Sequence, residues 1–170
     1  DVYKRQRKRK PLVFHELKEY CRTAYRTFEI ADLEADDVLG LMAGMPGLGR
    51  IKGEKIVVTI DKDLKTVPGL HFDPGNPDRG VIEVSKDQAD YNHLFQTLTG
   101  DAVDGYSGCP GIGPKRAERV LERPCWDSVV EAYASAGLEE EDALTQARVA
   151  RILRWGEYNV SGKKVRLWNP

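Results

Sequence analysis

The sequence predicts an α/β fold in which a central parallel sheet flanked by helices is followed by a helical region. Two observations support this fold class. Residues 55–61, KIVVTID, contain a near-continuous β-branched run, which is typical of a strand covered on both faces in a parallel sheet. From residue 86 onward the apolar pattern is helical. We therefore divide the chain into an α/β part, residues 1–85, and a helical part, residues 86–170.

Local patterns define the other elements. Residues 12–28 predict an amphipathic helix whose frayed end overlaps a short strand at 27–30. Residues 34–43 predict a helix with acidic residues in its first turn, where the helix dipole favours negative charge. Residues 81–84 predict another short strand. The helical part is expected at 86–98, 114–121, 126–134 and 139–155, with a terminal hairpin at 158–168.

Composition narrows the class of protein. Charged residues make up 31% of the 170 residues and hydrophobic ones 41%, which is typical of a soluble globular protein with one core. No apolar run approaches the roughly 18 residues that span a bilayer. The three cysteines lack paired or metal-ligand spacing, so free thiols in a reducing compartment are expected.

The net charge of −1 conceals a strong asymmetry along the chain. Residues 4–10, KRQRKRK, carry six positive charges and no negative one, so the remainder is acidic on balance. A basic arm on an acidic body fits a protein that attracts polyanions at one place and metal cations at another. A disordered, solvated tail or a segment added for expression is the alternative interpretation.

Three groups of acidic residues form a candidate metal site. The first group opens the helix predicted at 34–43, and the second follows the strand, where open α/β sheets place their ligand sites. The third lies in a turn before a Gly-Ile-Gly segment. If the fold gathers them, their repulsion would raise their pKa values or require bound cations. The seven residues are Glu34, Asp36, Asp37, Asp61, Asp63, Asp101 and Asp104.

Ligands that offer only oxygen favour hard ions such as Mg²⁺ or Mn²⁺. Two such ions about 4 Å apart can activate a water and stabilise the leaving oxygen of a phosphodiester. Each acidic group also has an ordinary interpretation, as a helix start, a turn or an N-cap. The pair Asp61 and Asp63 is the hardest to explain in that way. Two charges directly after an apolar strand are energetically unfavourable unless they have a function.

The segment Gly111-Ile112-Gly113, followed by a helix, predicts a contact to phosphate. Glycines allow close approach of another backbone, and the proline that follows suits the first helical position. The free N–H groups at the helix start can bind a phosphate oxygen together with Lys115 and Arg116. The pattern matches a helix-hairpin-helix, which grips a DNA backbone without reading bases.

Several motifs in order resemble the 5′-nuclease superfamily, which includes flap endonucleases and phage 5′–3′ exonucleases. Tyr3-Lys4-x-x-Arg7 resembles the family's helical arch, and Glu34-Ala35-Asp36-Asp37 its acidic helix start. Asp61-Lys62-Asp63 resembles its Asp-x-Asp pair. Gly100-Asp101-Ala102-Val103-Asp104, followed by Gly111-Ile112-Gly113, resembles its second metal site joined to a helix–three-turn–helix clamp. The stretches GDAVDGYSGCPGIG and QARVARILRWGEYNV are most similar to the short exonucleases of tailed phages.

The resemblance implies a PIN-like catalytic core with two Mg²⁺ or Mn²⁺ ions held by the seven acidic residues, with Asp61 and Asp63 catalytic. Lys4 and Arg7, in an arch segment at 1–10, would be catalytic through contact with the scissile phosphate, where they stabilise charge. Tyr3 would stack on a frayed base. The turn at Gly111-Ile112-Gly113 would hold a K⁺ ion and the duplex backbone.

The function that the resemblance implies is a structure-selective 5′–3′ exonuclease or flap endonuclease in phage DNA replication or recombination. Its substrate would be DNA with a 5′ end or flap. It would act as a monomer in the host cytoplasm and would not bind a membrane. The family's first metal-ligand aspartate and another before the arch have no counterpart here, so an N-terminally truncated member is expected. A non-catalytic DNA-binding module and a PIN-type ribonuclease are the alternatives, and the Gly-Ile-Gly clamp argues against the ribonuclease.

Overall fold

The computed structural model describes residues 11–47 and 53–170. The predicted arch residues Tyr3, Lys4 and Arg7 lie outside the described residues. In the described part, no helix is both long enough and apolar enough to cross a membrane.

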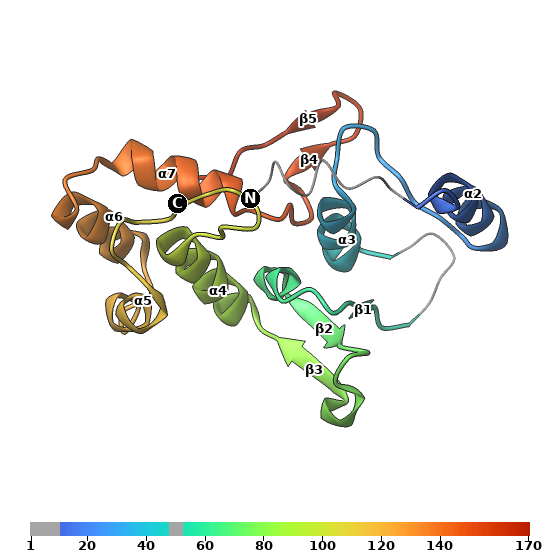
Figure 1. The fold of residues 1–170 in the computed structure, drawn as a ribbon, viewed down its shortest axis with the longest axis horizontal. Helices are drawn as coiled ribbons and strands as arrows, with labels where there is room; N and C mark the ends of the chain where they lie inside the picture. The colour runs from blue at the N-terminus through green and yellow to red at the C-terminus, as the bar shows by residue number, and fades with distance from the viewer. Residues whose placement is uncertain (1–10, 48–52) are drawn as a thin grey trace.

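A three-stranded mixed sheet forms the α/β part (Figure 1). Strand β1 (Ile56–Val58) pairs parallel with β2 (Gly69–Phe72), and β2 pairs antiparallel with β3 (Val81–Val84). The expected central parallel sheet is therefore confirmed only for β1 and β2, because β3 returns antiparallel alongside β2. The sequence does not predict β2, since this strand has only four residues and starts beside a Pro-Gly pair that is typical of a turn.

The prediction that the first strand is covered on both faces is also wrong. Val57 is 6% exposed, whereas Ile56 and Val58 are 45% and 59% exposed. Burial alternates along β1, as in a strand with one covered face. Val57 packs with Leu64 and Val67 into a small core beside α3 (Ala35–Gly44). The β-branched run therefore reflects strand propensity rather than burial on two sides.

Helix α2 (Phe14–Ala24) lies at the edge of the molecule, apart from the other helices (Figure 1). It is shorter than the predicted 12–28, and none of its residues is buried. Residues 27–30 form no strand, so that prediction is wrong. The segment instead turns back to its helix, where Glu29 forms an ion pair of 2.8 Å with Arg22.

Four helices pack into the helical part, as the sequence predicts. They are α4 (Lys86–Thr99), α5 (Pro114–Val120), α6 (Trp126–Ser135) and α7 (Glu140–Val149). Helix α4 contacts the other three and also the 3₁₀ helix η1 (Asp63–Thr66), so it joins the helical core to the sheet (Figure 1). The Tyr133 hydroxyl donates a 2.7 Å hydrogen bond to the Thr97 carbonyl. The buried core comprises Leu94, Leu98, Cys109, Ala117, Leu121, Val129, Tyr133 and Ala143.

The helix predicted at 139–155 ends six residues early, at Val149. Beyond it, the Leu153 amide donates to Asp37 Oδ1 at 3.0 Å, and the Arg154 guanidinium donates to the Thr66 carbonyl. The Leu153 amide and the Arg154 amide, which donates to Glu157 Oε2 at 2.9 Å, thus bond side chains instead of the carbonyls that another helical turn would offer. The hairpin predicted at 158–168 is confirmed by β4 (Tyr158–Asn159) and β5 (Lys164–Val165), which pair antiparallel. A second 3₁₀ helix, η2 (Pro77–Arg79), precedes β3.

Substitution Gly40→Ala tests the contact between α3 and the segment after α7. A Cβ at Gly40 would lie 2.2 Å from the Leu153 carbonyl oxygen, so the two segments must separate. We expect a loss of about 3 kcal/mol in the free energy of unfolding, measured by chemical denaturation. Gly113→Ala is the control, because nothing lies within 4 Å of its added Cβ, and it should cost less than about 1 kcal/mol. Equal losses in the two variants would contradict the packing.

Candidate metal centre

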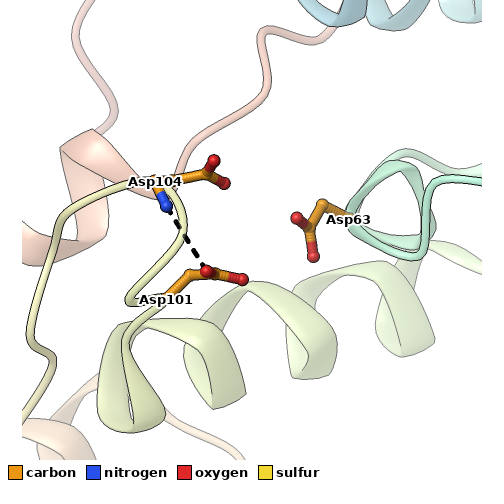
Figure 2. Close-up of side chains that lie close together, drawn as sticks. All are labelled: Asp63, Asp101 and Asp104. Atoms are coloured by element: carbon orange, nitrogen blue, oxygen red, sulfur yellow. Dashed lines mark hydrogen bonds between the residues drawn. The ribbon is translucent and has the colours of Figure 1, made fainter. Parts of the chain in front are cut away.

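Three carboxylates from two segments face one another at the centre of the site (Figure 2). Asp63 projects from η1, while Asp101 and Asp104 project from the loop that follows α4. One oxygen from each of them lies within 4.8 Å of the other two. This spacing allows a single cation to contact all three.

A pocket of about 490 Å³ extends from this triad and collects the other candidate ligands. Helix α3 contributes residues at its N-terminus, and the segment after β1 contributes the Asp-x-Asp pair. The structure thus brings together residues that are far apart in sequence. The acidic residues that line the pocket are Glu34, Asp36, Asp37, Asp61, Asp63 and Asp104, and Asp101 joins them through the triad.

The conformation of the loop after α4 is set by the side chain of Asp101 and by two glycines. Asp101 Oδ1 accepts hydrogen bonds from the amides of Val103 (2.7 Å) and Asp104 (3.4 Å). Gly100 and Gly108 have φ angles of 67° and 65°, and a Cβ on Gly100 would lie 2.5 Å from the Gly108 nitrogen. Only glycine combines this conformation with such a close approach. The result is a tight loop that presents Asp101 and Asp104 to the pocket.

The Asp-x-Asp pair is fixed by short polar contacts. Asp61 Oδ1 accepts from the Asp63 amide at 2.9 Å, and the Asp61 amide donates to the Thr59 hydroxyl at the same distance. Gln96, on α4, donates to Asp63 Oδ1 at 2.6 Å. These contacts hold the Asp63 carboxylate in a defined orientation and leave its second oxygen for a ligand.

The carboxylates perturb one another's ionisation. Burial, together with the charges of Asp61, Glu34, Asp37 and Asp104, raises the pKa of Asp36 above its ordinary value. Burial and nearby carboxylates likewise raise the pKa of Asp63, against the opposing effect of Lys62. An arrangement that disfavours its own ionised state is stabilised by a bound cation.

Two members of the cluster differ from the rest. The backbone amide of Val103 is the largest of the contacts that lower the pKa of Asp101, so this residue stays ionised. Asp37 Oδ1 accepts from the Leu153 amide, so this carboxylate also anchors the segment after α7. Asp37 therefore has a structural role in addition to any role as a metal ligand.

The structure adds residues that the sequence analysis did not select. Lys62 lies inside the Asp-x-Asp motif, and its Nζ is 3.3 Å from Asp101 Oδ2. Tyr106, Arg148 and Arg151 line the pocket, and they occur in the two stretches that resemble phage exonucleases. Gln96 had no sequence signal, because a glutamine within an amphipathic helix carries no pattern of its own.

The predicted phosphate-binding turn lies at the start of α5. Gly111 has a φ of 75°, and its carbonyl accepts a 2.9 Å hydrogen bond from Arg116 Nη1. Gly113 is the N-cap, and no atom lies near the position of a Cβ on it. Lys115 and Arg116 are exposed, while Ile112 packs against the helical core. The turn is thus open to solvent, with two cations beside it.

The sequence of the chain is similar to those of several known nucleases. The chain is 32% identical to the exodeoxyribonuclease of Enterobacteria phage T3 and to the exonuclease of Escherichia phage T7. Both matches cover 99% of the chain and 67% of the relative. It is also 31% identical to flap endonuclease Xni of Shewanella piezotolerans, over 78% of the chain and 55% of that protein. No protein-family model matches the chain, and no solved structure matches it significantly.

The mixed α/β fold with its carboxylate pocket, taken with these relatives, defines the chain as a nuclease. It belongs to the 5′-nuclease superfamily, as its motifs suggest.

Substitution Asp36→Asn tests the repulsion within the pocket. Because the pKa of Asp36 is raised in the folded state, its ionisation destabilises the fold above that pKa and has no effect below the unfolded value. The variant should therefore gain up to about 1 kcal/mol at pH 7 in the presence of a chelator, and the gain should shrink towards about pH 4.

Thermal unfolding at several pH values measures this effect. The matched control is Asp78→Asn, at an exposed residue of η2 that does not line the pocket, and its stability should not change. A gain for the Asp36 variant that does not depend on pH would refute the account.

Proposed function

We propose that this protein hydrolyses phosphodiester bonds of DNA at a 5′ end or flap, with two divalent ions bound in the carboxylate pocket. The observation that carries the proposal is the gathering of seven carboxylates from three separate segments. The relatives named exonuclease and flap endonuclease support this choice of substrate and reaction.

The donor set fits hard divalent ions. Every candidate ligand is a carboxylate, and among the described residues no histidine or cysteine lines the pocket, which favours Mg²⁺ or Mn²⁺ over zinc. Asp63, Asp101 and Asp104 would hold one ion, and Glu34, Asp36, Asp37 and Asp61 would hold a second, directly or through water. When bound, such ions activate a water and stabilise the leaving oxygen.

The chain's own residues divide the remaining work. Gln96 orients the carboxylate of Asp63, and the amides of the loop orient Asp101. Arg148 and Arg151 line the pocket, and the partly exposed guanidinium of Arg148 can attract the phosphodiester. Arg151 also forms an ion pair with Glu157, which fixes its position.

Helix α4, the loop that follows it and α5 form the proposed helix–three-turn–helix clamp, within a DNA-binding part at 86–170 that follows a catalytic part at 1–85. Gly111, Ile112, Gly113, Lys115 and Arg116 would hold the duplex backbone there. A K⁺ ion in this turn would have to share the Gly111 carbonyl with Arg116, which already donates to it.

The proposal extends to the residues outside the described part and to the biological setting. Lys4 and Arg7 would contact the scissile phosphate, and Tyr3 would stack on a frayed base. We place the enzyme in phage DNA replication or recombination, acting as a monomer in the host cytoplasm.

The variants Asp61→Asn and Asp104→Asn test the reaction. With flapped or 5′-recessed DNA and Mg²⁺, the unmodified chain should release 5′ products, and each variant should cut on the order of 100-fold more slowly or not at all. Both variants should keep their affinity for DNA. Asp78→Asn is the control and should cut at the unmodified rate, because Asp78 is exposed and does not line the pocket.

The alternatives give different results in the same assay. Binding without cleavage, even by the unmodified chain, would identify a non-catalytic DNA-binding module. Cleavage of RNA in preference to DNA would identify a ribonuclease of the PIN type.

Substitution Lys115→Ala tests the clamp. Loss of one phosphate contact should weaken DNA binding severalfold at low salt and reduce the slope of log affinity against log salt by about 1. Fluorescence anisotropy with a labelled duplex measures both quantities. The control is Lys18→Ala on α2, an exposed lysine outside the proposed DNA-binding part, and it should leave the salt slope unchanged. An unchanged salt slope in the Lys115 variant would exclude this residue from the clamp.

A further inference from the structure

Lys62 places a cation among the candidate metal ligands. Its Nζ lies 3.3 Å from Asp101 Oδ2 and 3.9 Å from Asp63 Oδ1. Within residues 11–47 and 53–170, no other lysine, arginine or histidine nitrogen comes within 4.0 Å of a carboxylate oxygen of the metal centre. A single ammonium group therefore balances charge in the triad.

The contact to Asp101 involves the one oxygen that this residue has left to offer. Its Oδ1 already accepts from two backbone amides, one of which is drawn in Figure 2. Oδ2 accepts from Lys62. An ion held jointly by Asp63 and Asp101 has to take this Oδ2, so Lys62 and the metal compete for the same atom.

We propose that Lys62 is an internal counter-ion of the metal centre, which a divalent ion must displace in order to bind. In the metal-free protein, the ammonium lies between the Asp63 and Asp101 carboxylates and offsets their mutual repulsion. The competition lowers metal affinity but keeps the ligands arranged for the ion. This inference rests on the proposed metal-dependent function.

The surroundings of Lys62 allow the displacement. Its side chain is 75% exposed, so no packed core has to open when it leaves. It also lines a neighbouring hollow of about 90 Å³, together with Thr59 and Phe72, and Asp61 lines both this hollow and the carboxylate pocket. The released ammonium can move into this space, where water solvates it.

Lys65 provides a matched control on the same hollow. It lines that space but forms no ion pair within 4.0 Å in the described part of the chain. It is also absent from the charges that shift the pKa of Asp63. Removing its charge changes the general field near the site without freeing a ligand oxygen.

Titration of the 170-residue chain with Mn²⁺, followed by calorimetry or by the electron paramagnetic resonance of free Mn²⁺, tests the proposal. Lys62→Met should bind Mn²⁺ roughly three- to tenfold more tightly than the unmodified chain, the factor expected when exposed ion pairs no longer compete. Lys62→Arg keeps the charge and should bind like the unmodified chain. Lys65→Met should change affinity by less than about twofold.

Each contrary result has a distinct meaning. Equal or weaker binding by Lys62→Met, or an equal gain in Lys65→Met, would overturn the counter-ion while leaving the metal centre in place. If neither the unmodified chain nor Lys62→Met binds Mn²⁺ saturably, the proposed function itself fails and the inference fails with it. Because Lys62 is exposed, circular dichroism should show that all three variants are folded.

Discussion

Mutual repulsion among the seven carboxylates of the metal centre is the constraint on which the rest of this structure depends. Burial and neighbouring charges raise the pKa of both Asp36 and Asp63, so the fold holds these groups against their own ionisation. Such an arrangement is stabilised only when cations balance it. Lys62 supplies one positive charge, and divalent ions would supply the others.

The scaffold around the pocket is built to resist this repulsion. Helix α4 joins the helical core to the sheet and carries Gln96, which holds Asp63. The segment after α7 packs against Gly40 and bonds Asp37, so α3 cannot move away from the site. The contacts that stabilise the fold therefore also position the ligands. A substitution that breaks one of these contacts should disturb both the fold and the site.

The sequence predicts the parts of this arrangement that depend on local pattern. The acidic first turn predicts α3, the apolar pattern after residue 86 predicts α4, and the acidic groups stand out at the ends of elements. Burial of β1 could not be predicted, because a β-branched run has the same appearance whether one face or both are covered. The end of α7 at Val149 also could not be predicted from the local sequence, since it depends on a hydrogen bond from Leu153 to a residue far away in sequence. Gln96 and Lys62 acquire their importance only from the assembled geometry.

The central claim is that the carboxylates form a metal centre, and the most direct measurement is a crystal structure of the chain soaked in Mn²⁺ with anomalous diffraction data. The account predicts one anomalous peak bounded by Asp63, Asp101 and Asp104 and a second peak towards Asp36 and Asp61. It also predicts that Lys62 has moved away from Asp101 Oδ2. A map without a peak in the pocket, at a Mn²⁺ concentration that supports DNA cleavage, would contradict it.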